Sequence, residues 1–265
     1  MIFLLDKEKM LSHIQDKDDL MELSNILDKA ELALKRHQPV STNFLNPYHL
    51  HLAKPILENI ADLKVMVFGG YKRAERNRIA LMPDYYINDL VDSPIALLNI
   101  KGQFKFQRVS HRDFLGALLG LGIKREMVGD LLVNKDACQA IVAEEIKDYI
   151  IMNLDQVHKI GVKIEEFSFD RINVEEEKVK IIKSTVSSLR LDSVASSGFS
   201  TSRNKMSKEI GQGKVKVNWK VIDNPAHSID LDDIISIRGR GRVEIDEVLG
   251  ESNRGRIKLN LKRYI

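Results

Sequence analysis

The sequence predicts an α+β protein with a helical, mixed α+β N-terminal region, a ferredoxin-like (split βαβ) plait and a basic C-terminal module. Three observations predict it: apolar residues at helical spacing near the start, alternating strand and helix patterns in the middle, and a basic stretch with its own helix and strand at the end. The expected domains are residues 1–90, 91–184 and 185–265, and RNA binding is expected of the plait at 91–184 as well as of the C-terminal module. A chain of 265 residues is long enough for two or three domains.

The N-terminal region begins with helical patterns. Apolar residues recur three and four positions apart between residues 6 and 37. Pro47 is suited to the first turn of another helix running to Ile60, because the amide hydrogen that proline lacks is unpaired at that position anyway. The stretch "LKVMVFGGYKRAERNRIALMP" then places two apolar runs around Gly69 and Gly70. These runs predict either a hairpin or a strand–helix junction.

The middle of the chain alternates between strand and helix patterns. The predicted order is strand, helix, strand, strand, helix, strand, over Ile95–Ile100, His111–Leu119, Asp130–Val133, Cys138–Val142, Ala143–Leu154 and Val157–Ile164. This is the order of a ferredoxin-like plait, an architecture that many unrelated functions share. In "KGQFKFQR", Phe104 and Phe106 alternate between basic flanks, which suits either nucleic-acid contact or packing within the sheet.

Composition excludes several classes of protein. The single Cys138 forms no internal disulfide, which predicts a reducing compartment. No apolar stretch approaches the roughly 20 residues of a membrane span, and "MIFLLDKEKM" lacks the basic start of a signal peptide. His49 and His51 have no cluster of cysteines or carboxylates beside them to complete a metal site. We expect a cytoplasmic monomer with no membrane contact, metal or other cofactor.

Basic residues concentrate toward the end of the chain. Residues 185–265 contain 15 Lys+Arg and 10 Asp+Glu, whereas the preceding residues contain 26 and 28. A basic module attached to a neutral or acidic body is typical of polyanion-binding proteins.

The stretch "STSRNKMSKEIGQGKVKVNWK" predicts a short helix within this module. Ser202 is a suitable N-cap, because its hydroxyl can accept a hydrogen bond from a first-turn amide. Met206 and Ile210 lie one turn apart and are expected to face the core. Gly211 is expected to end the helix in the left-handed conformation. A shorter helix precedes this one and is expected to end near Gly198.

A strand follows the helix. Val215 and Val217 alternate with Lys214 and Lys216, so the lysines should share the face opposite the valines. The helix contributes two further lysines, Lys205 and Lys208. We expect the helix and strand lysines to form one basic surface across the corner at residues 211–213.

These residues resemble a known pattern, that of the small RNA-binding domain named after ribosomal small-subunit protein S-four. The matching positions, in order, are Arg190-Leu191-Asp192, Ser202-Arg203, Ile210, Gly213, Val215, Val217-Asn218, Pro225 and Asp233-Ile234-Ile235. Trp219 and Asp232 stand where the pattern has glycine. The first departure argues against a type I′ turn after Val217, because tryptophan disfavours positive φ.

The chain as a whole resembles the YlmH family of bacterial proteins. The stretches "VFGGYKRAERNRI", "HRDFLGALLGLGIKREMVGDLLV" and "VKVNWK" carry this resemblance over nearly the full length, and tryptophan after asparagine is the usual form in that family. The resemblance implies a non-enzymatic factor of ribosome-associated quality control. It implies large-subunit rRNA and tRNA as partners, with peptidyl-tRNA held in the P site.

The candidate RNA-binding residues are polar and basic side chains of the C-terminal module. They are Arg190, Ser202, Arg203, Lys205, Lys208, Gln212, Lys214, Lys216, Asn218, Trp219, Lys220, Arg238 and Arg240. Cationic side chains gain RNA affinity by releasing counterions from phosphates; the alternative is that they are merely solvated.

Several roles within this set stay open. Arg190 serves either the fold or RNA contact, whereas Asp192 is expected to cap or pair with the first helix. Trp219 either stacks on a base or packs over the hairpin. "RGRGR" predicts a strand on which Arg238, Arg240 and Arg242 alternate onto one face.

Two other functions also stay open. "RLD" at Arg190-Leu191-Asp192 resembles part of the "GRLD" motif of pseudouridine synthases, which would make the chain an RNA-modifying enzyme with an S-four-type targeting domain; no second "RLD" with a preceding glycine occurs upstream. The gene neighbourhood of the family suggests an interaction protein in cell division. Arg73, Glu75 and Arg76 form either a surface ion-pair cluster or a second ribosome contact.

Overall fold

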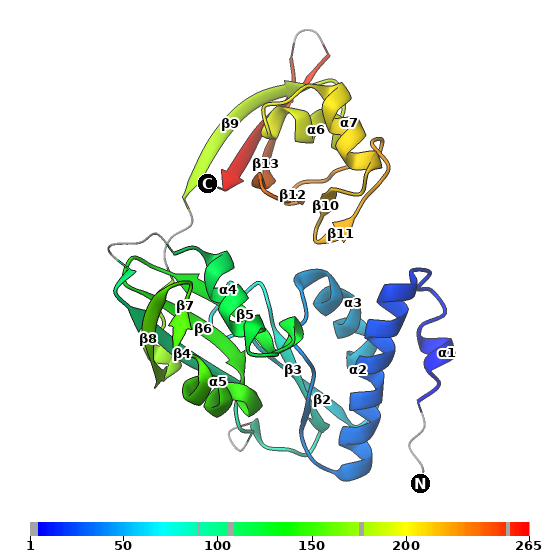
Figure 1. Cartoon of the computed structure of the whole chain (residues 1–265). Helices are drawn as coiled ribbons and strands as arrows, with labels where there is room; N and C mark the ends of the chain where they lie inside the picture. The colour runs from blue at the N-terminus through cyan, green and yellow to red at the C-terminus, as the bar shows by residue number, and fades with distance from the viewer. Residues whose placement is uncertain (1–4, 89–90, 105–108, 175–177, 253–254, 265) are drawn as a thin grey trace. The chain divides into compact units, whose positions relative to one another are not determined.

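The computed structural model describes the chain except for residues 1–4, 89–90, 105–108, 175–177, 253–254 and 265. The chain forms two compact units, residues 1–175 (unit 1) and 176–265 (unit 2), and both combine helices with sheets (Figure 1). The predicted α+β class is therefore confirmed. The finer division at residues 90 and 184 stays a prediction. No helix in the described part of the chain is long and apolar enough to cross a membrane.

The N-terminal part of unit 1 packs helices against a small sheet. Its elements are α1 (Lys7–Met10), α2 (Lys17–Arg36), β1 (Val40–Ser41), α3 (Pro47–Glu58), β2 (Leu63–Phe68) and β3 (Arg78–Pro83). Asp16 caps α2 by accepting hydrogen bonds from the Asp18 and Asp19 amides, and Pro47 occupies the first turn of α3 as expected. β2 and β3 pair antiparallel, so the ambiguous stretch after the helices is a hairpin.

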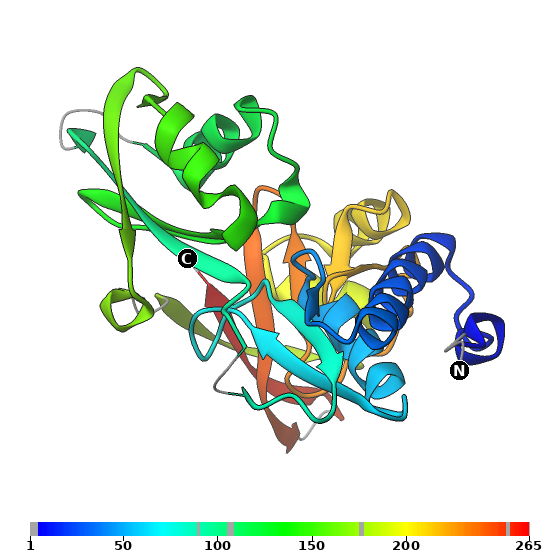
Figure 2. The ribbon, with the colours of Figure 1, turned by 90° about the horizontal axis from the view of Figure 1, so that it is seen from below.

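The second part of unit 1 is the plait. Its elements are β4 (Ile95–Gly102), α4 (His111–Gly120), η3 (Arg125–Met127), β5 (Val128–Val133), β6 (Ala137–Ala143), η4 (Glu144–Ile146), α5 (Lys147–Asn153), β7 (Gln156–Val157), β8 (Ile160–Phe167) and η5 (Phe169–Arg171). The sheet order is β5-β6-β4-β8-β7, with antiparallel neighbours. Without the short β7, this is ferredoxin-like topology. The green helices lie on one face of this sheet in Figure 2.

Three details of the plait differ from the sequence prediction. The second helix begins at Lys147, because residues 137–143 continue as a fully buried strand. The last strand is divided in two by a turn at His158, which has φ +57°. Phe104 is buried with its ring edge-on to Phe114, at a centroid distance of 5.2 Å, so it packs in the core; Phe106 lies outside the described residues.

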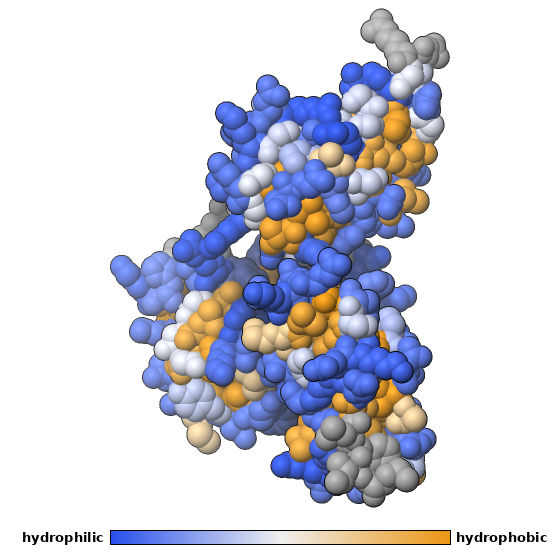
Figure 3. Space-filling view, turned by 90° about the vertical axis from the view of Figure 1, so that its right-hand side faces the viewer, coloured by the Kyte–Doolittle hydropathy of each residue, from blue (hydrophilic) through white to orange (hydrophobic). Residues whose placement is uncertain are grey.

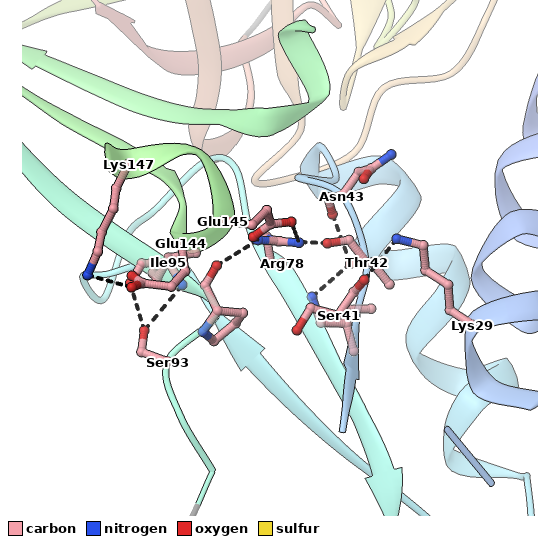
Figure 4. A network of polar contacts seen from close by, with 12 residues as sticks. Lys29, Ser41, Thr42, Asn43, Arg78, Ser93, Ile95, Glu144, Glu145 and Lys147 are labelled. Atoms are coloured by element: carbon pink, nitrogen blue, oxygen red, sulfur yellow. Dashed lines mark hydrogen bonds and ion pairs between the residues drawn. The ribbon is translucent and has the colours of Figure 1, made fainter. Parts of the chain in front are cut away.

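A buried arginine joins the two parts of unit 1. Arg78 on β3 donates to the Thr42 and Pro94 carbonyl oxygens, both at 2.6 Å, and to both carboxylate oxygens of Glu145 at 2.7 and 2.8 Å (Figure 4). The Arg78 side chain is only 3% exposed. A buried guanidinium is tolerated when each of its nitrogens donates to an acceptor, as here, so this network fixes the N-terminal part against the plait.

Unit 2 is a six-stranded antiparallel sheet with two helices on one face. Its elements are β9 (Val179–Val186), α6 (Leu191–Gly198), α7 (Arg203–Gly211), β10 (Val215–Val217), β11 (Lys220–Val221), β12 (Ile234–Ile237), β13 (Gly241–Glu251) and β14 (Ile257–Tyr264). The sheet order is β11-β10-β12-β13-β14-β9, so β9 pairs with β14 and lies in unit 2, although residues 179–184 precede the expected boundary. The core between helices and sheet contains Met206, Ile210, Val215 and Val217, as predicted.

Candidate nucleic-acid interface

A single carboxylate fixes two arginines at the start of the helical pair. Asp192, near the start of α6, is buried. The Arg190 guanidinium donates to both of its oxygens at 3.2 Å, and the Arg203 guanidinium donates to both at 3.0 Å. The arginine side chains are still 42% and 45% exposed, so each guanidinium is held in place without being removed from solvent. Asp192 was expected to have a structural role, and in the structure it forms an ion pair with both Arg190 and Arg203.

The electrostatics of Asp192 follow from this arrangement. Burial acts to raise the pKa of the carboxyl, but the hydrogen bonds from Arg190 and Arg203 outweigh burial and bring the pKa below its ordinary value. Asp192 therefore stays ionised near neutral pH. Two guanidinium charges against one carboxylate leave the cluster with a net positive charge at the surface.

Helix α7 continues the basic surface from Arg203. Its N-cap is Ser202, whose hydroxyl accepts a hydrogen bond from the Lys205 amide at 3.3 Å, as predicted. Lys205 and Lys208 are exposed, while Met206 and Ile210 are buried. Hydrophilic side chains cover much of the unit 2 surface that faces the viewer in Figure 3, so hydropathy alone does not mark the interface.

The corner after α7 differs in detail from the prediction. Gly211 is the last helical residue, Gln212 follows as the C-cap with φ −90°, and Gly213 takes the left-handed conformation with φ +67°. The predicted left-handed cap at Gly211 is thus two residues too early. Gly213 is the position that needs glycine, because it redirects the chain into β10.

Lys216 does not lie on the same face as the helix lysines. Val215 and Val217 belong to the core beneath α7, so Lys216 between them projects from the opposite face of the sheet. Lys214 precedes the strand and is exposed, as are Lys216 and Lys220. A continuous basic surface would have to pass around the edge of the unit, rather than lie flat across the corner as expected.

The hairpin after β10 contains a backbone conformation that the sequence argued against. Val217 pairs with Lys220, and the two residues between them, Asn218 and Trp219, have φ +47° and +68°. Positive φ at both central residues is the type I′ pattern, so the prediction that tryptophan excludes this turn is wrong. The left-handed conformation costs a non-glycine residue roughly 1–2 kcal/mol, which the surrounding unit must offset.

The side chain of Asn218 is engaged within the unit. Its amide nitrogen donates to the Asp233 carboxylate at 2.7 Å, and its amide oxygen accepts from the Ile234 backbone at 2.9 Å. These contacts tie the hairpin tip to the start of β12. Asn218 therefore supports the turn, which in part explains how Trp219 is held in its strained conformation.

The first three residues of "RGRGR" form a turn, and only Gly241 and Arg242 belong to a strand. β12 ends at Ile237 and β13 begins at Gly241, while Gly239 and Gly241 have φ +82° and +86°. Arg238 is exposed within this turn. Arg240 is half-buried and pairs with Glu209 of α7 at 2.7 Å, so the two arginines do not alternate on one strand face as predicted.

Three family models match successive parts of the sequence. They are described as "YlmH, N-terminal" for residues 18–86, "Putative RNA-binding domain in YlmH" for residues 89–171 and "S4 domain" for residues 189–235. The chain is also 33% identical over 247 residues to "Ribosome-associated protein quality control protein P2" of Bacillus subtilis (strain 168); the match spans 93% of this chain and 96% of that protein. The chain belongs to the YlmH family.

A solved structure agrees with this assignment. The "Cell division protein ylmH from Streptococcus pneumoniae" matches with a TM-score of 0.51 and 26% identity, over 60% of this chain and 97% of that one. The S4 match contains α6, α7 and the hairpin with Trp219. The predicted S-four-type domain is therefore confirmed, and its sheet is extended by β9, β13 and β14.

The sequence did not indicate the residues that hold unit 1 together. Asp130 accepts hydrogen bonds from the Tyr71 hydroxyl at 2.8 Å and from the Glu75 and Arg76 amides at 2.7 and 3.2 Å. Arg76 donates to the Phe44 and Val128 carbonyls, which makes it an anchor between segments. The partners are more than 30 positions apart, so no local spacing could have indicated them.

Proposed function

We propose that this YlmH-family chain is a non-enzymatic RNA-binding protein that acts on the ribosome in quality control. The observation that carries the proposal is the pair of half-exposed guanidiniums, Arg190 and Arg203, that Asp192 orients beside the N-terminus of α7. Held cations bind phosphates with less loss of side-chain freedom than mobile ones. The name of the Bacillus subtilis relative supports the ribosomal setting.

In finer terms, we propose that unit 2 binds rRNA of the large subunit and peptidyl-tRNA, and so keeps the tRNA in the P site. Structured RNA is recognised mainly through its shape and backbone, which suits a compact surface of arginines and lysines. Arg190, Arg203, Lys205 and Lys208 would contact phosphates, and Trp219 at the hairpin tip would stack on a base.

An RNA-modifying activity at "RLD" has less support. A catalytic aspartate must reach its substrate, whereas Asp192 is buried and both of its oxygens accept from two arginines. This geometry suits a carboxylate that holds the two arginine side chains in position.

Sedimentation with ribosomal subunits across a salt series tests the proposal. We expect wild-type protein to migrate with the large subunit at low salt and to dissociate as salt rises. Lys205→Ala combined with Lys208→Ala should weaken binding about tenfold and lower the salt slope by about two, because two phosphate contacts are lost. The matched control is Lys183→Ala with Lys258→Ala, which removes two exposed lysines from other positions in unit 2.

Salt-insensitive or absent co-migration would contradict the ribosomal proposal. Equal loss of binding in both double variants would contradict the assignment of the face, because it would reduce the effect to net charge. Nucleoside analysis of RNA from cells lacking the protein separates the enzymatic alternative, which requires a missing modification.

A further inference from the structure

Strands β9, β13 and β14 extend the sheet of unit 2 beyond the part that the S4 model matches. That model covers residues 189–235, whereas β9 precedes this range and β13 and β14 follow it. The three strands are neighbours in the sheet, in the order β13-β14-β9. Because β9 and β13 both pair antiparallel with β14, they begin where β14 ends. A pocket of about 630 Å³ lies at these strand ends.

The pocket is enclosed by the strand ends and by the segment that follows α6. Its lining consists of residues 180–182 of β9, residues 263–264 of β14, Gly241 of β13, the turn residue Arg240, and Ser200 after α6. Of the described residues that line it, three are cationic and none is acidic. Pockets for small organic ligands have volumes of about 300–1,000 Å³, so this one suits a molecule of roughly mononucleotide size.

Two cations lie directly opposite each other in this pocket. The strand register pairs Lys180 of β9 with Arg263 of β14. Both side chains project on the helical side of the sheet, because Ile182 and Leu261, two positions away on the same strands, pack into the core beneath the helices. Directly opposite residues of an antiparallel pair have Cβ atoms about 5 Å apart, and like charges at such positions destabilise a sheet. An anion bound between the two side chains would replace this repulsion with attraction.

Both cations have donors available for such an anion. The Arg263 guanidinium lies 5.6 Å from the centre of the Phe199 ring and donates to the Gly198 carbonyl at 3.4 Å, which holds it at the end of α6. These contacts leave most of its five N–H donors unused. Lys180 is exposed, and its ammonium group forms no ion pair or hydrogen bond with any residue that the structure describes.

The carboxylates near the pocket are engaged elsewhere. Glu209 of α7 accepts from Arg240 at 2.7 Å, so this ion pair adds little net charge. Glu244 accepts from the Tyr264 hydroxyl and lies on the opposite face of the sheet, because the residues on either side of it belong to the core. The glutamates at positions 175–177 lie outside the described residues. Among the described groups, the charge that remains in the pocket is that of the opposed lysine and arginine.

Ser200 supplies a further donor at the edge of the pocket. Its backbone has φ +51°, in the left-handed region that serine rarely adopts. Backbone strain of this kind is concentrated at sites that bind ligands. The Ser200 hydroxyl forms no hydrogen bond with a described residue, so it is available to donate to an anion in the pocket.

We propose that this pocket binds a small phosphorylated metabolite of about mononucleotide size. Lys180 and Arg263 bind the phosphate group from two sides, and Ser200 donates to it. The organic part of the ligand occupies the remaining volume, because a phosphate ion is much smaller than the pocket. The site includes none of the four side chains proposed above to contact RNA phosphates. It is therefore a small-molecule site that does not depend on the proposed RNA-binding function.

The test is calorimetric titration of the full-length protein with defined probes. The probes are adenosine and guanosine 5′-monophosphates, the two unphosphorylated nucleosides, ribose 5-phosphate and inorganic phosphate. Lys180→Gln removes one phosphate contact without removing a contact within the fold. Lys183→Gln is the matched control, because it makes the same charge change on the same strand but on its other face.

We expect the wild-type protein to bind a nucleotide more tightly than its nucleoside or inorganic phosphate. Lys180→Gln should weaken nucleotide binding about tenfold, and Lys183→Gln less than about twofold, because only the first removes a charge-assisted hydrogen bond. Ser200→Gly suits the left-handed backbone and should weaken binding about threefold by removing the hydroxyl. Thermal unfolding followed by Trp219 fluorescence confirms that folded variants are compared.

Four results would overturn the proposal. They are no saturable binding of any phosphorylated probe, nucleosides that bind as tightly as nucleotides, inorganic phosphate that binds as tightly as nucleotides, and equal weakening by Lys180→Gln and Lys183→Gln. A 5′-phosphorylated RNA oligonucleotide is the remaining comparison. If it binds more tightly than the mononucleotides, and Lys180→Gln removes this advantage, the occupant is the end of an RNA chain and the metabolite is excluded.

Discussion

Asp130 in unit 1 and Asp192 in unit 2 both organise the residues around them, but in different ways. Asp192 accepts from two guanidiniums and so positions side chains. Asp130 accepts from two backbone amides and a tyrosine hydroxyl, and so positions a loop. Direct ion pairs lower the pKa of Asp192 despite its burial, whereas burial dominates at Asp130 and raises its pKa. Neutral and cationic donors therefore give the same residue type opposite electrostatic properties.

Removing Asp130 should give the largest effect. Asp130→Ala leaves two backbone amides and the Tyr71 hydroxyl without their acceptor, at about 1–3 kcal/mol for each buried group left unpaired. We expect unit 1 to lose about 3 kcal/mol of unfolding free energy and residues 70–76 to lose protection in hydrogen exchange. Asp84→Ala, at an exposed position, should change stability by less than about 0.5 kcal/mol. Equal effects of the two variants would mean that Asp130 does not anchor the loop.

Asp192→Asn should have the next largest effect. It keeps the shape but removes the charge that pairs both arginines, so we expect unit 2 to lose about 2 kcal/mol, less than a fully buried pair because the guanidiniums are half exposed. Trp219 is the single tryptophan of the chain, so its fluorescence reports unfolding of unit 2. Asp223→Asn, at an exposed position, is the control, and a matching loss there would refute the ion-pair role.

The opposite pKa shifts predict opposite pH dependences. The contribution of Asp192 to the free energy of unfolding is fully present at pH values above the ordinary aspartate pKa of 3.8. It is lost as the pH falls through the lowered pKa that Asp192 has in the folded protein. The contribution of Asp130 to the free energy of unfolding is greatest below pH 3.8. It declines as the pH rises through the raised pKa that Asp130 has in the folded protein. Each slope is at most about 1.4 kcal/mol per pH unit. Hydrogen exchange for unit 1 and fluorescence for unit 2, each with its aspartate variant, measure these slopes; slopes of one sign would contradict the comparison.

Trp219→Gly should have the smallest effect on stability. Glycine relieves the left-handed conformation but loses the contacts of the indole, so we expect the unfolding free energy to change by less than about 1 kcal/mol. Trp219→Ala keeps the strain and loses the ring, so it should be the less stable variant by circular dichroism. If both variants retain wild-type RNA affinity, the stacking role of Trp219 is excluded.

The sequence predicted most of the plait and of the S4 domain, because both depend on local periodicity. The α7 cap at Ser202, the inward Met206 and the alternating valines all follow from spacing along one element. The same logic failed at turns. The sequence predicted a left-handed residue at Gly211, argued against one at Trp219 and predicted a strand over the Arg238–Arg240 stretch. These predictions failed because the conformation of a turn depends on contacts with distant residues, such as the hydrogen bond from Asn218 to Asp233.

Long-range polar contacts were beyond prediction. Nothing near Arg78 in the sequence indicates that its guanidinium meets Glu145, and nothing near Tyr71 indicates Asp130. The RNA-binding residues stay predictions. The structure refines them by separating Arg190, Arg203, Lys205 and Lys208 from Lys216, which lies on another face.

The Arg78 network also has a consequence for synthesis. Arg78 and Glu145 are 67 positions apart, so β3 leaves the translating ribosome well before its ionic partner is made. Until then, a guanidinium destined for the interior lacks its counter-charge, and the N-terminal sheet is expected to remain only partly formed. Nascent unit 1 should therefore acquire protease resistance late and in one step. For the same reason, a fragment cut near residue 86 would lose the Pro94 carbonyl and Glu145, and would be a poor candidate for independent folding.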